Sequence, residues 1–292
     1  MLVRKALASS NPALEIELFY DVASPYTWLA FETLVRYTSI WDADIRFRPF
    51  FLGGVMNSTG NKPPGQLKAK AKYMVEDTRR MARHFSVPLR QPSDPTVILR
   101  TLQAQRLLTA TSVDHPGLLV ALSRELWMRL WGRDQAIDTS EGLVEACTLA
   151  GLSAEATRSL MARSREGEIK ERLKAETQVA VDRGAFGAPC IFVRVTARPG
   201  CGETTGAGAG PGVKPQKAGM GQKGAKDEEE AEEEEEGGHW QHYFGCDRFE
   251  AMAEAFAQPW YGPCPGPSRR PDYGVGAGGD EEVARVPPSS RL

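Results

Sequence analysis

The sequence has few cysteines, and their arrangement excludes the chemistry of paired thiols. Its 292 residues contain five cysteines, Cys147, Cys190, Cys201, Cys246 and Cys264. None of them belongs to a C-x-x-C motif, and no two have the spacing of a zinc finger. An odd number of scattered cysteines does not build a disulfide framework and is typical of proteins in a reducing compartment.

The sequence also lacks the features of three further classes of protein. No apolar run reaches the ~18 residues of a membrane-spanning helix, so we expect no membrane span. Lys and Arg number 36 and Asp and Glu 38, a net charge of −2, and this balance excludes a generally basic nucleic-acid binder. The four histidines have no carboxylate or cysteine partners at metal-ligand spacing, so we predict no metal.

The residues that are abundant are distributed unevenly along the chain. Residues 227–236 contain nine acids in ten positions, and 197–238 holds eleven of the 29 glycines. This segment has too few large apolar residues to offset the entropy lost on ordering, so we predict that 197–238 is disordered. The tail 264–292 has the same character and is predicted to be disordered as well. The rest of the chain is long enough for a sizeable core.

The start of the chain predicts a strand, a helix and a second strand. Residues 14–22 are rich in large apolar and β-branched side chains, and residues 45–50 alternate, so both segments indicate strands. Between them, Ser24 followed by Pro25 is typical of a helix start. Ser accepts a hydrogen bond from a free amide there, and Pro loses no N–H that the helix needs. Together these segments predict a parallel β-α-β unit.

The middle of the chain shows only helical periodicity. Residues 53–65 are rich in Gly, Asn and Pro and indicate a loop. We then expect helices near 66–85, 95–112, 116–132, 139–150 and 153–183, strands at 190–193 and 239–245, and a last helix from 249. Asp138 is expected to cap one of these helices. Trp127, Met128 and Trp131 are expected to pack inside the helical core.

Five motifs resemble those of one known family, in the same order. They are ELFYDVASPYTWLAFE at 17–32, GNKPPGQLKAK at 60–70, SRELWMRLW at 123–131, GAFGAP at 184–189 and FGCDRFE at 244–250. The chain resembles the α/β thioredoxin-like fold with an inserted all-helical domain, as in the DsbA-like group. Within that group it is similar to kappa-class glutathione transferases. The resemblance implies a thioredoxin-like domain at 14–60 and 184–263, a helical insertion domain at 61–183, and a homodimer.

The start of the first predicted helix is the expected catalytic position. Redox members of this fold have C-x-x-C there, and this chain has Ser24, Pro25, Tyr26 and Thr27, which excludes dithiol exchange by that route. A helix N-terminus still stabilises an anion. The resemblance implies that the anion is the thiolate of glutathione, bound at Ser24, Pro25 and Tyr26, and that the Ser24 hydroxyl donates to the sulfur. The alternative is that Ser24 only caps the helix.

The resemblance implies further contacts with glutathione. Pro189 matches a cis proline in the family, and Ala188 before it would pair with the tripeptide backbone; the alternative is a trans-proline turn. Asn61 would contribute its amide group, or else only form a turn. Cys246 stands where the family usually has Ser. Asp247, expected at a helix start, would bind the ammonium group of glutathione. The alternative is that Asp247 is an ordinary cap, with Arg248 as its surface ion pair.

The resemblance implies an enzyme that conjugates glutathione to small electrophiles, or that uses it to reduce hydroperoxides. One alternative is a glutathione-dependent enzyme like 2-hydroxychromene-2-carboxylate isomerase. Another, of a different class, is a thioredoxin-like binding or chaperone module without turnover. For location, Ser290-Arg291-Leu292 is similar to the peroxisomal S-K-L signal. Arg4 and Lys5, with no acid before Glu15, favour a mitochondrial presequence.

Overall fold

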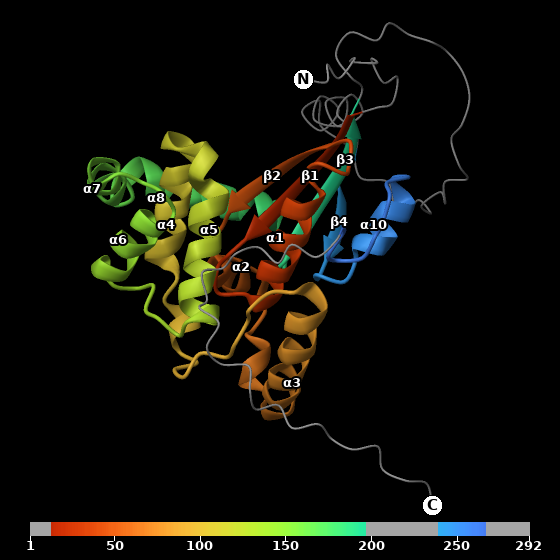
Figure 1. Cartoon of the computed structure of the whole chain (residues 1–292), viewed down its shortest axis with the longest axis horizontal. Helices are drawn as coiled ribbons and strands as arrows, with labels where there is room; N and C mark the ends of the chain where they lie inside the picture. The colour runs from red at the N-terminus through yellow and green to blue at the C-terminus, as the bar shows by residue number, and fades with distance from the viewer. Residues whose placement is uncertain (1–12, 197–238, 267–292) are drawn as a thin grey trace, which may run out of the picture.

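The computed structural model describes residues 13–196 and 239–266 (Figure 1). Four expectations from the sequence therefore lie outside the described residues. They are the disorder of 197–238, the disorder of the tail beyond 266, the signal at 290–292 and the presequence around Arg4 and Lys5. None of the described helices is both long enough and apolar enough to cross a lipid bilayer.

A mixed sheet forms the centre of the described part of the molecule. Its strands are β1 (Ala13–Tyr20), β2 (Ala43–Pro49), β3 (Cys190–Thr196) and β4 (Gln241–Phe244), in the order β2-β1-β3-β4. β1 and β2 are parallel because α1 (Pro25–Tyr37) carries the chain back between them. β3 pairs antiparallel with both β1 and β4. The β-α-β unit predicted at the start of the chain is present.

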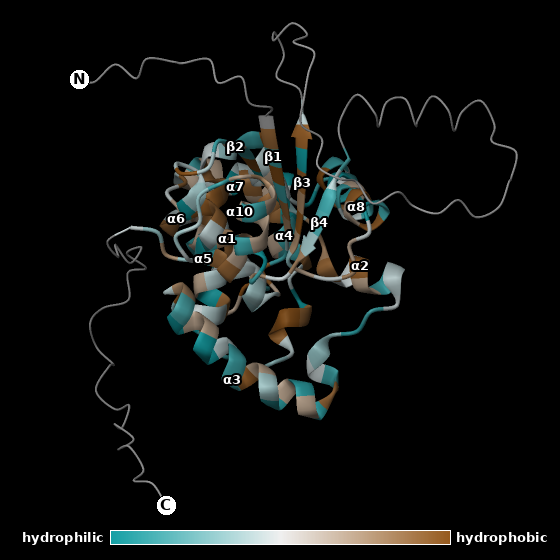
Figure 2. Ribbon diagram, turned by 90° about the vertical axis from the view of Figure 1, so that its right-hand side faces the viewer, coloured by the Kyte–Doolittle hydropathy of each residue, from teal (hydrophilic) through white to brown (hydrophobic). Residues whose placement is uncertain are grey.

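The two faces of the sheet are buried by different helices. Alternate residues of β1, among them Ile16 and Leu18, join the larger core, to which α1 and α10 (Phe249–Ala255) also contribute. Phe19 faces the other way, into a smaller core that contains residues of α2 (Leu52–Thr59) and α8 (Gly167–Asp182). Figure 2 shows β1 as largely hydrophobic and the edge strand β4 as largely hydrophilic.

Helices occupy the chain between β2 and β3. After α2 they are a 3-10 turn at Pro64–Gln66, α3 (Lys68–Phe85), a 3-10 turn at Val97–Leu99, α4 (Leu102–Asp114), a 3-10 turn at Pro116–Leu118, α5 (Leu119–Trp127), a π-helical turn at Met128–Gly132, α6 (Ser140–Leu149), α7 (Ala154–Arg163) and α8. The sequence predicted one helix over 153–183, but the chain forms two. The break falls just before Gly167, a residue with low helix propensity.

One element contradicts the sequence prediction. Residues 53–65 indicated a loop, yet Leu52–Thr59 forms α2. The first amides of this segment are held by side chains far away in the sequence: Asp21 Oδ2 accepts from Leu52 N at 2.9 Å, and Thr177 Oγ1 accepts from Phe51 N at 3.0 Å. These bonds satisfy amide groups that no residue of the segment itself caps. The loop prediction failed because the capping groups come from the residue just after β1 and from α8.

The cap of α6 also differs from the prediction. Thr139, rather than Asp138, is the N-cap residue, and its Oγ1 accepts from Gly142 N at 3.1 Å. Asp138 instead pairs with Arg100 at 3.0 Å. Capping requires extended backbone at the cap residue, and Thr139 has it, with φ −101° and ψ 150°.

The chain after α10 packs against α1 and α3. Arg36 Nη1 donates to the carbonyl of Pro263 at 2.8 Å and to Cys264 Sγ at 3.2 Å. Tyr37 donates from its hydroxyl to the carbonyl of Gly262 at 2.8 Å. Cys264, which the sequence assigned to the disordered tail, is therefore in contact with the folded core.

Candidate functional site

Ser24 caps α1 as the sequence predicted. Its backbone is extended, and its Oγ accepts from Thr27 N at 3.2 Å. Pro25 takes the first helical position, so no N–H is left unbonded there. Ser24 is 7% exposed, which places its hydroxyl just beneath the surface at the positive end of the helix.

Two tryptophans hold the turn that leads into α1. Trp127 Nε1 donates to the carbonyl of Ser24 at 3.3 Å, and Trp131 Nε1 donates to the carbonyl of Val22 at 2.9 Å. Both indoles are buried, as is Met128, which confirms the prediction that these residues pack in the core. The two hydrogen bonds were not predicted. Helical periodicity indicates which face of a helix is buried and gives no information on where an indole N–H points.

The start of α1 faces the turn before β3. The Ala188–Pro189 peptide bond is cis, as the family resemblance implied. Ser24 Oγ lies 3.5 Å from the carbonyl oxygen of Ala188. This distance is at the outer limit of a hydrogen bond, so the Ser24 hydroxyl has only a weak acceptor here. The structure thus brings the capping serine and the cis-proline turn side by side.

Asn61 lies on the other side of the same turn. Its Nδ2 donates to the carbonyl of Phe186 at 2.6 Å, and its Oδ1 accepts from Lys62 N at 2.8 Å. The loop around Asn61 forms an open pocket of about 440 Å³. This pocket is lined by Gly60, Asn61, Lys62, Pro63, Pro64, Gln66, Leu67 and Lys70. The lysines give it a positive charge next to the turn.

The segment after β4 lies against the cis-proline turn. Gly245 N donates to the carbonyl of Pro189 at 3.3 Å. Gly245 has φ +104°, and a Cβ added there would lie 2.6 Å from Asp247 Oδ1, so a side chain would meet the carboxylate. Asp247 is exposed and pairs with Arg248 at 3.3 Å. Helix α10 begins at Phe249, as predicted, but its N-cap residue is Arg248, so Asp247 does not cap it.

Cys246, between these residues, is buried and 4% exposed. Burial raises the pKa of its thiol to about 12, and the negative charge of Asp247 acts in the same direction. Cys246 therefore stays a protonated thiol at neutral pH. Any thiolate at this site is therefore not that of Cys246.

Tyr26 connects the start of α1 to α3. Its hydroxyl donates to Asp77 Oδ2 at 2.8 Å, and Tyr73 donates to Oδ1 of the same carboxylate at 3.2 Å. Partial burial and then Asp77 raise the pKa of Tyr26 well above its usual range, so its hydroxyl stays protonated. This bond fixes α3, and the Asn61 loop before it, relative to Ser24.

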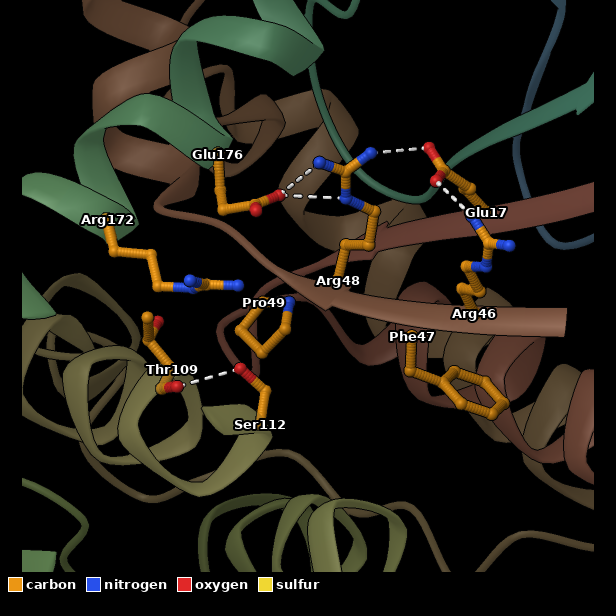
Figure 3. Close-up of a pocket in the computed structure, with 9 residues that line it drawn as sticks. All are labelled: Glu17, Arg46, Phe47, Arg48, Pro49, Thr109, Ser112, Arg172 and Glu176. Carbon is orange, nitrogen blue, oxygen red and sulfur yellow. Dashed lines mark hydrogen bonds and ion pairs between the residues drawn. The ribbon is translucent and has the colours of Figure 1, made fainter. Parts of the chain in front are cut away.

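A second pocket, of about 390 Å³, lies between β2, α4 and α8 and contains none of the predicted site residues (Figure 3). Its charged groups largely neutralise one another. Arg48 lies 2.6 Å from both Glu17 and Glu176, and Arg46 lies 2.5 Å from Asp44. Apart from Arg172, these charges are already paired, and none of the predicted residues lies here, so the site at Ser24 is the better candidate. Among the described residues no group of His, Cys, Asp and Glu is arranged to hold a metal.

Comparison with known proteins decides the family. Residues 15–209 match the family described as DSBA-like thioredoxin domain. Human glutathione S-transferase kappa 1 is 34% identical over 253 residues, which cover 86% of this chain and 94% of the human protein. The chain belongs to the kappa class of the DsbA-like thioredoxin family. Rat glutathione S-transferase kappa 1 is 32% identical over 253 residues, which cover 86% of this chain and 94% of the rat protein.

More distant relatives share the fold. A 2-hydroxychromene-2-carboxylate isomerase of Sphingobium xenophagum is 31% identical over 185 residues, which cover 61% of this kappa-class chain and 88% of that protein. A solved structure of a 2-hydroxychromene-2-carboxylate isomerase superposes with a TM-score of 0.57 at 18% identity, covering 83% of this chain and 94% of the other. The fold class and the family predicted from the sequence are confirmed. The roles of the individual site residues stay predictions.

Proposed function

We propose that this chain is a glutathione transferase that holds the glutathione thiolate at the start of α1 and directs it at small electrophiles. The observation that carries the proposal is the contact between Ser24 Oγ and the carbonyl of Ala188, before cis Pro189. It places a hydroxyl, a helix N-terminus and an accessible backbone segment at one point. The relatives named glutathione S-transferase kappa 1 support the same function.

The polar groups around Ser24 fit a thiolate. Thr27 N already donates to Ser24 Oγ, so the hydroxyl proton points away from this amide, and its present acceptor, the carbonyl of Ala188, is 3.5 Å away. Turning this proton toward a sulfur anion gives up one weak hydrogen bond and forms a charge-assisted one. The positive end of α1 stabilises the same anion. Both effects lower the pKa of the bound thiol and increase the fraction of nucleophile at neutral pH.

The rest of the tripeptide has partners around the site. Ala188 offers a backbone N–H and C=O to the cysteinyl unit of glutathione. The exposed carboxylate of Asp247 suits the ammonium group. On the opposite side, Asn61 and the lysines Lys62 and Lys70 suit the glycyl carboxylate. In a substitution, the sulfur forms a bond to carbon while the leaving group departs with its electron pair, so the protein supplies no acid.

The test is a titration with glutathione, followed by the ultraviolet absorbance of the thiolate. The Ser24→Ala variant is compared with Ser153→Ala, which removes the N-cap of α7, where Ser153 Oγ accepts from Ala156 N at 3.1 Å. Both variants lose a cap, at a cost of about 1 kcal/mol in stability. Only Ser24→Ala should lose the thiolate, because only Ser24 faces the site. An equal thiolate fraction in wild type and Ser24→Ala refutes the role of Ser24, and absence of glutathione binding favours a binding module.

Isomerisation is the second candidate, and the resemblance to the Sphingobium xenophagum isomerase favours it. It uses the same bound thiolate, so binding experiments do not separate the two functions. Turnover of a chlorodinitrobenzene-type acceptor indicates conjugation, and turnover of 2-hydroxychromene-2-carboxylate without conjugation indicates isomerisation. Reduction of a hydroperoxide by two glutathiones, giving an alcohol, water and glutathione disulfide, is measured on the same protein.

Two further expectations belong to this proposal. The resemblance to kappa-class transferases supports a homodimer, which light scattering of the purified chain tests by mass. Ser290-Arg291-Leu292 supports a peroxisomal location, and the amino terminus supports a mitochondrial one. Deleting the last three residues and imaging the protein tests the peroxisomal location, since an unchanged distribution rules it out.

A further inference from the structure

A completely buried carboxylate holds the turn that leads to the proposed thiolate site. Asp21 follows the last residue of β1, three positions before Ser24, and is 0% exposed. Its two oxygens accept three hydrogen bonds, from Ala23 N at 2.9 Å, Leu52 N at 2.9 Å and Thr101 Oγ1 at 3.2 Å. A buried carboxylate is costly unless its oxygens are satisfied, and these donors satisfy them.

The donors belong to the two sides of the site. Ala23 N lies in the turn that delivers Ser24, and the backbone carbonyl of Asp21 also accepts from Ser24 N at 3.1 Å. Leu52 N is the first amide of α2, the helix that ends directly before Gly60 and Asn61. One carboxylate thus joins the serine turn to the helix that carries the asparagine loop.

Helix α4 completes this connection. Gln105 is 0% exposed, and its Nε2 donates to the carbonyls of Tyr20 at 2.8 Å and Phe50 at 2.6 Å. Thr101 lies four residues earlier, just before the helix, and donates to Asp21. The ends of β1 and β2 are therefore held together by polar groups from the helical insertion.

We propose that Asp21 is a positioning residue, which fixes Ser24 relative to Asn61 through the turn at Ala23 and through α2. It touches neither the substrate nor the reacting sulfur. Its effect is to keep the Ser24 hydroxyl and the Asn61 amide at the separation that one bound tripeptide requires. The inference rests on the proposed function, since it concerns how glutathione is oriented at that site.

The alternative is that Asp21 only stabilises the fold. The two roles differ in what an isosteric substitution does. Asp21→Asn keeps the shape but replaces one accepting oxygen with a donor, which then faces an N–H or O–H that also donates. The serine turn or α2 must shift to relieve this conflict. A shift of the sulfur site of about 1 Å is enough to lower turnover strongly.

The experiment compares Asp21→Asn with Glu17→Gln. Glu17, within β1, is a second buried carboxylate, 4% exposed, which accepts from Arg48 at 2.6 Å and Arg183 at 2.5 Å. Both substitutions remove a buried negative charge, and only Asp21→Asn changes a group that is bonded to the turn before Ser24. We expect Asp21→Asn to lower kcat about tenfold or more and to raise the pKa of bound glutathione by about one unit. Glu17→Gln should stay within about twofold of wild type in both.

A milder variant covers the case in which Asp21→Asn does not fold. Thr101→Val removes one of the three donors and leaves the carboxylate in place, so a loss of roughly threefold in kcat is expected. Hydrogen exchange of the Ala23 and Leu52 amides supplies a readout that does not depend on glutathione. Both amides should exchange faster in Asp21→Asn than in Glu17→Gln.

The outcomes separate the two proposals. If wild type holds a glutathione thiolate and Asp21→Asn keeps the same kcat and thiol pKa, the positioning role is overturned and the proposed function stands. If wild type forms no bound thiolate, the proposed function fails, and the positioning role of Asp21 fails with it. Equal losses in Asp21→Asn and Glu17→Gln also overturn the inference, because a general loss of stability then explains both.

Discussion

Gly245 offers the sharpest test of how the site holds the amino end of glutathione. In Gly245→Ala the alanine must keep the backbone φ of +104°, and its Cβ would lie 2.6 Å from Asp247 Oδ1. The backbone strain costs about 1–3 kcal/mol. The Asp247 side chain is exposed and flexible, so it moves aside, and the carboxylate leaves the place where it would meet the ammonium group.

Gly151→Ala is the matched control. Gly151 has φ +96° at the end of α6, and a Cβ there would have nothing within 4 Å. Both variants therefore carry similar backbone strain, and each kcal/mol lowers Tm by about 2–4 °C in a domain of this size. Only Gly245→Ala moves Asp247.

The expected difference appears in the binding of glutathione. An exposed ionic contact contributes up to about 1 kcal/mol, so KM for glutathione should rise roughly twofold to fivefold in Gly245→Ala. At saturating glutathione kcat should change little, because the added methyl group meets Asp247 and not Ser24. Steady-state kinetics with a chlorodinitrobenzene-type acceptor measures both constants. Equal KM values in the two variants would refute the assignment of Asp247 to the ammonium group.

Two further predictions concern ionisation. Burial raises the pKa of the Cys246 thiol to about 12, so a thiol reagent at pH 8 should modify Cys246 much more slowly than the partly exposed Cys264. Peptide mass spectrometry measures the order of labelling, and faster labelling of Cys246 contradicts the prediction. Burial also raises the pKa of Asp21 from 3.8 to about 6, so the folded state binds this proton more tightly than the unfolded state. The contribution of Asp21 to stability should therefore fall as pH rises from 4 to 6. Urea unfolding of wild type relative to Asp21→Asn measures it, and a difference that is constant over this range contradicts the prediction.

The sequence by itself determined the order of the main elements and the place of the site. A buried strand followed by Ser24 and Pro25 specifies where α1 begins, because capping and the proline ring act within a few residues. Because Ser24 stands where redox members of the fold have cysteine, the sequence alone excluded dithiol exchange by that route. The family motifs implied the cis bond at Pro189, which the structure contains.

Only the tertiary structure decided which distant groups support that site. Helix α2 forms where the sequence indicated a loop, since its caps are Asp21 and Thr177 from other segments. The hydrogen bonds of Trp127 and Trp131 to the serine turn were likewise not predicted from the sequence, although the burial of both rings was. Local propensity and periodicity depend on neighbours within a few residues. A hydrogen bond between side chains and backbone that lie tens of residues apart exists only after the chain has folded.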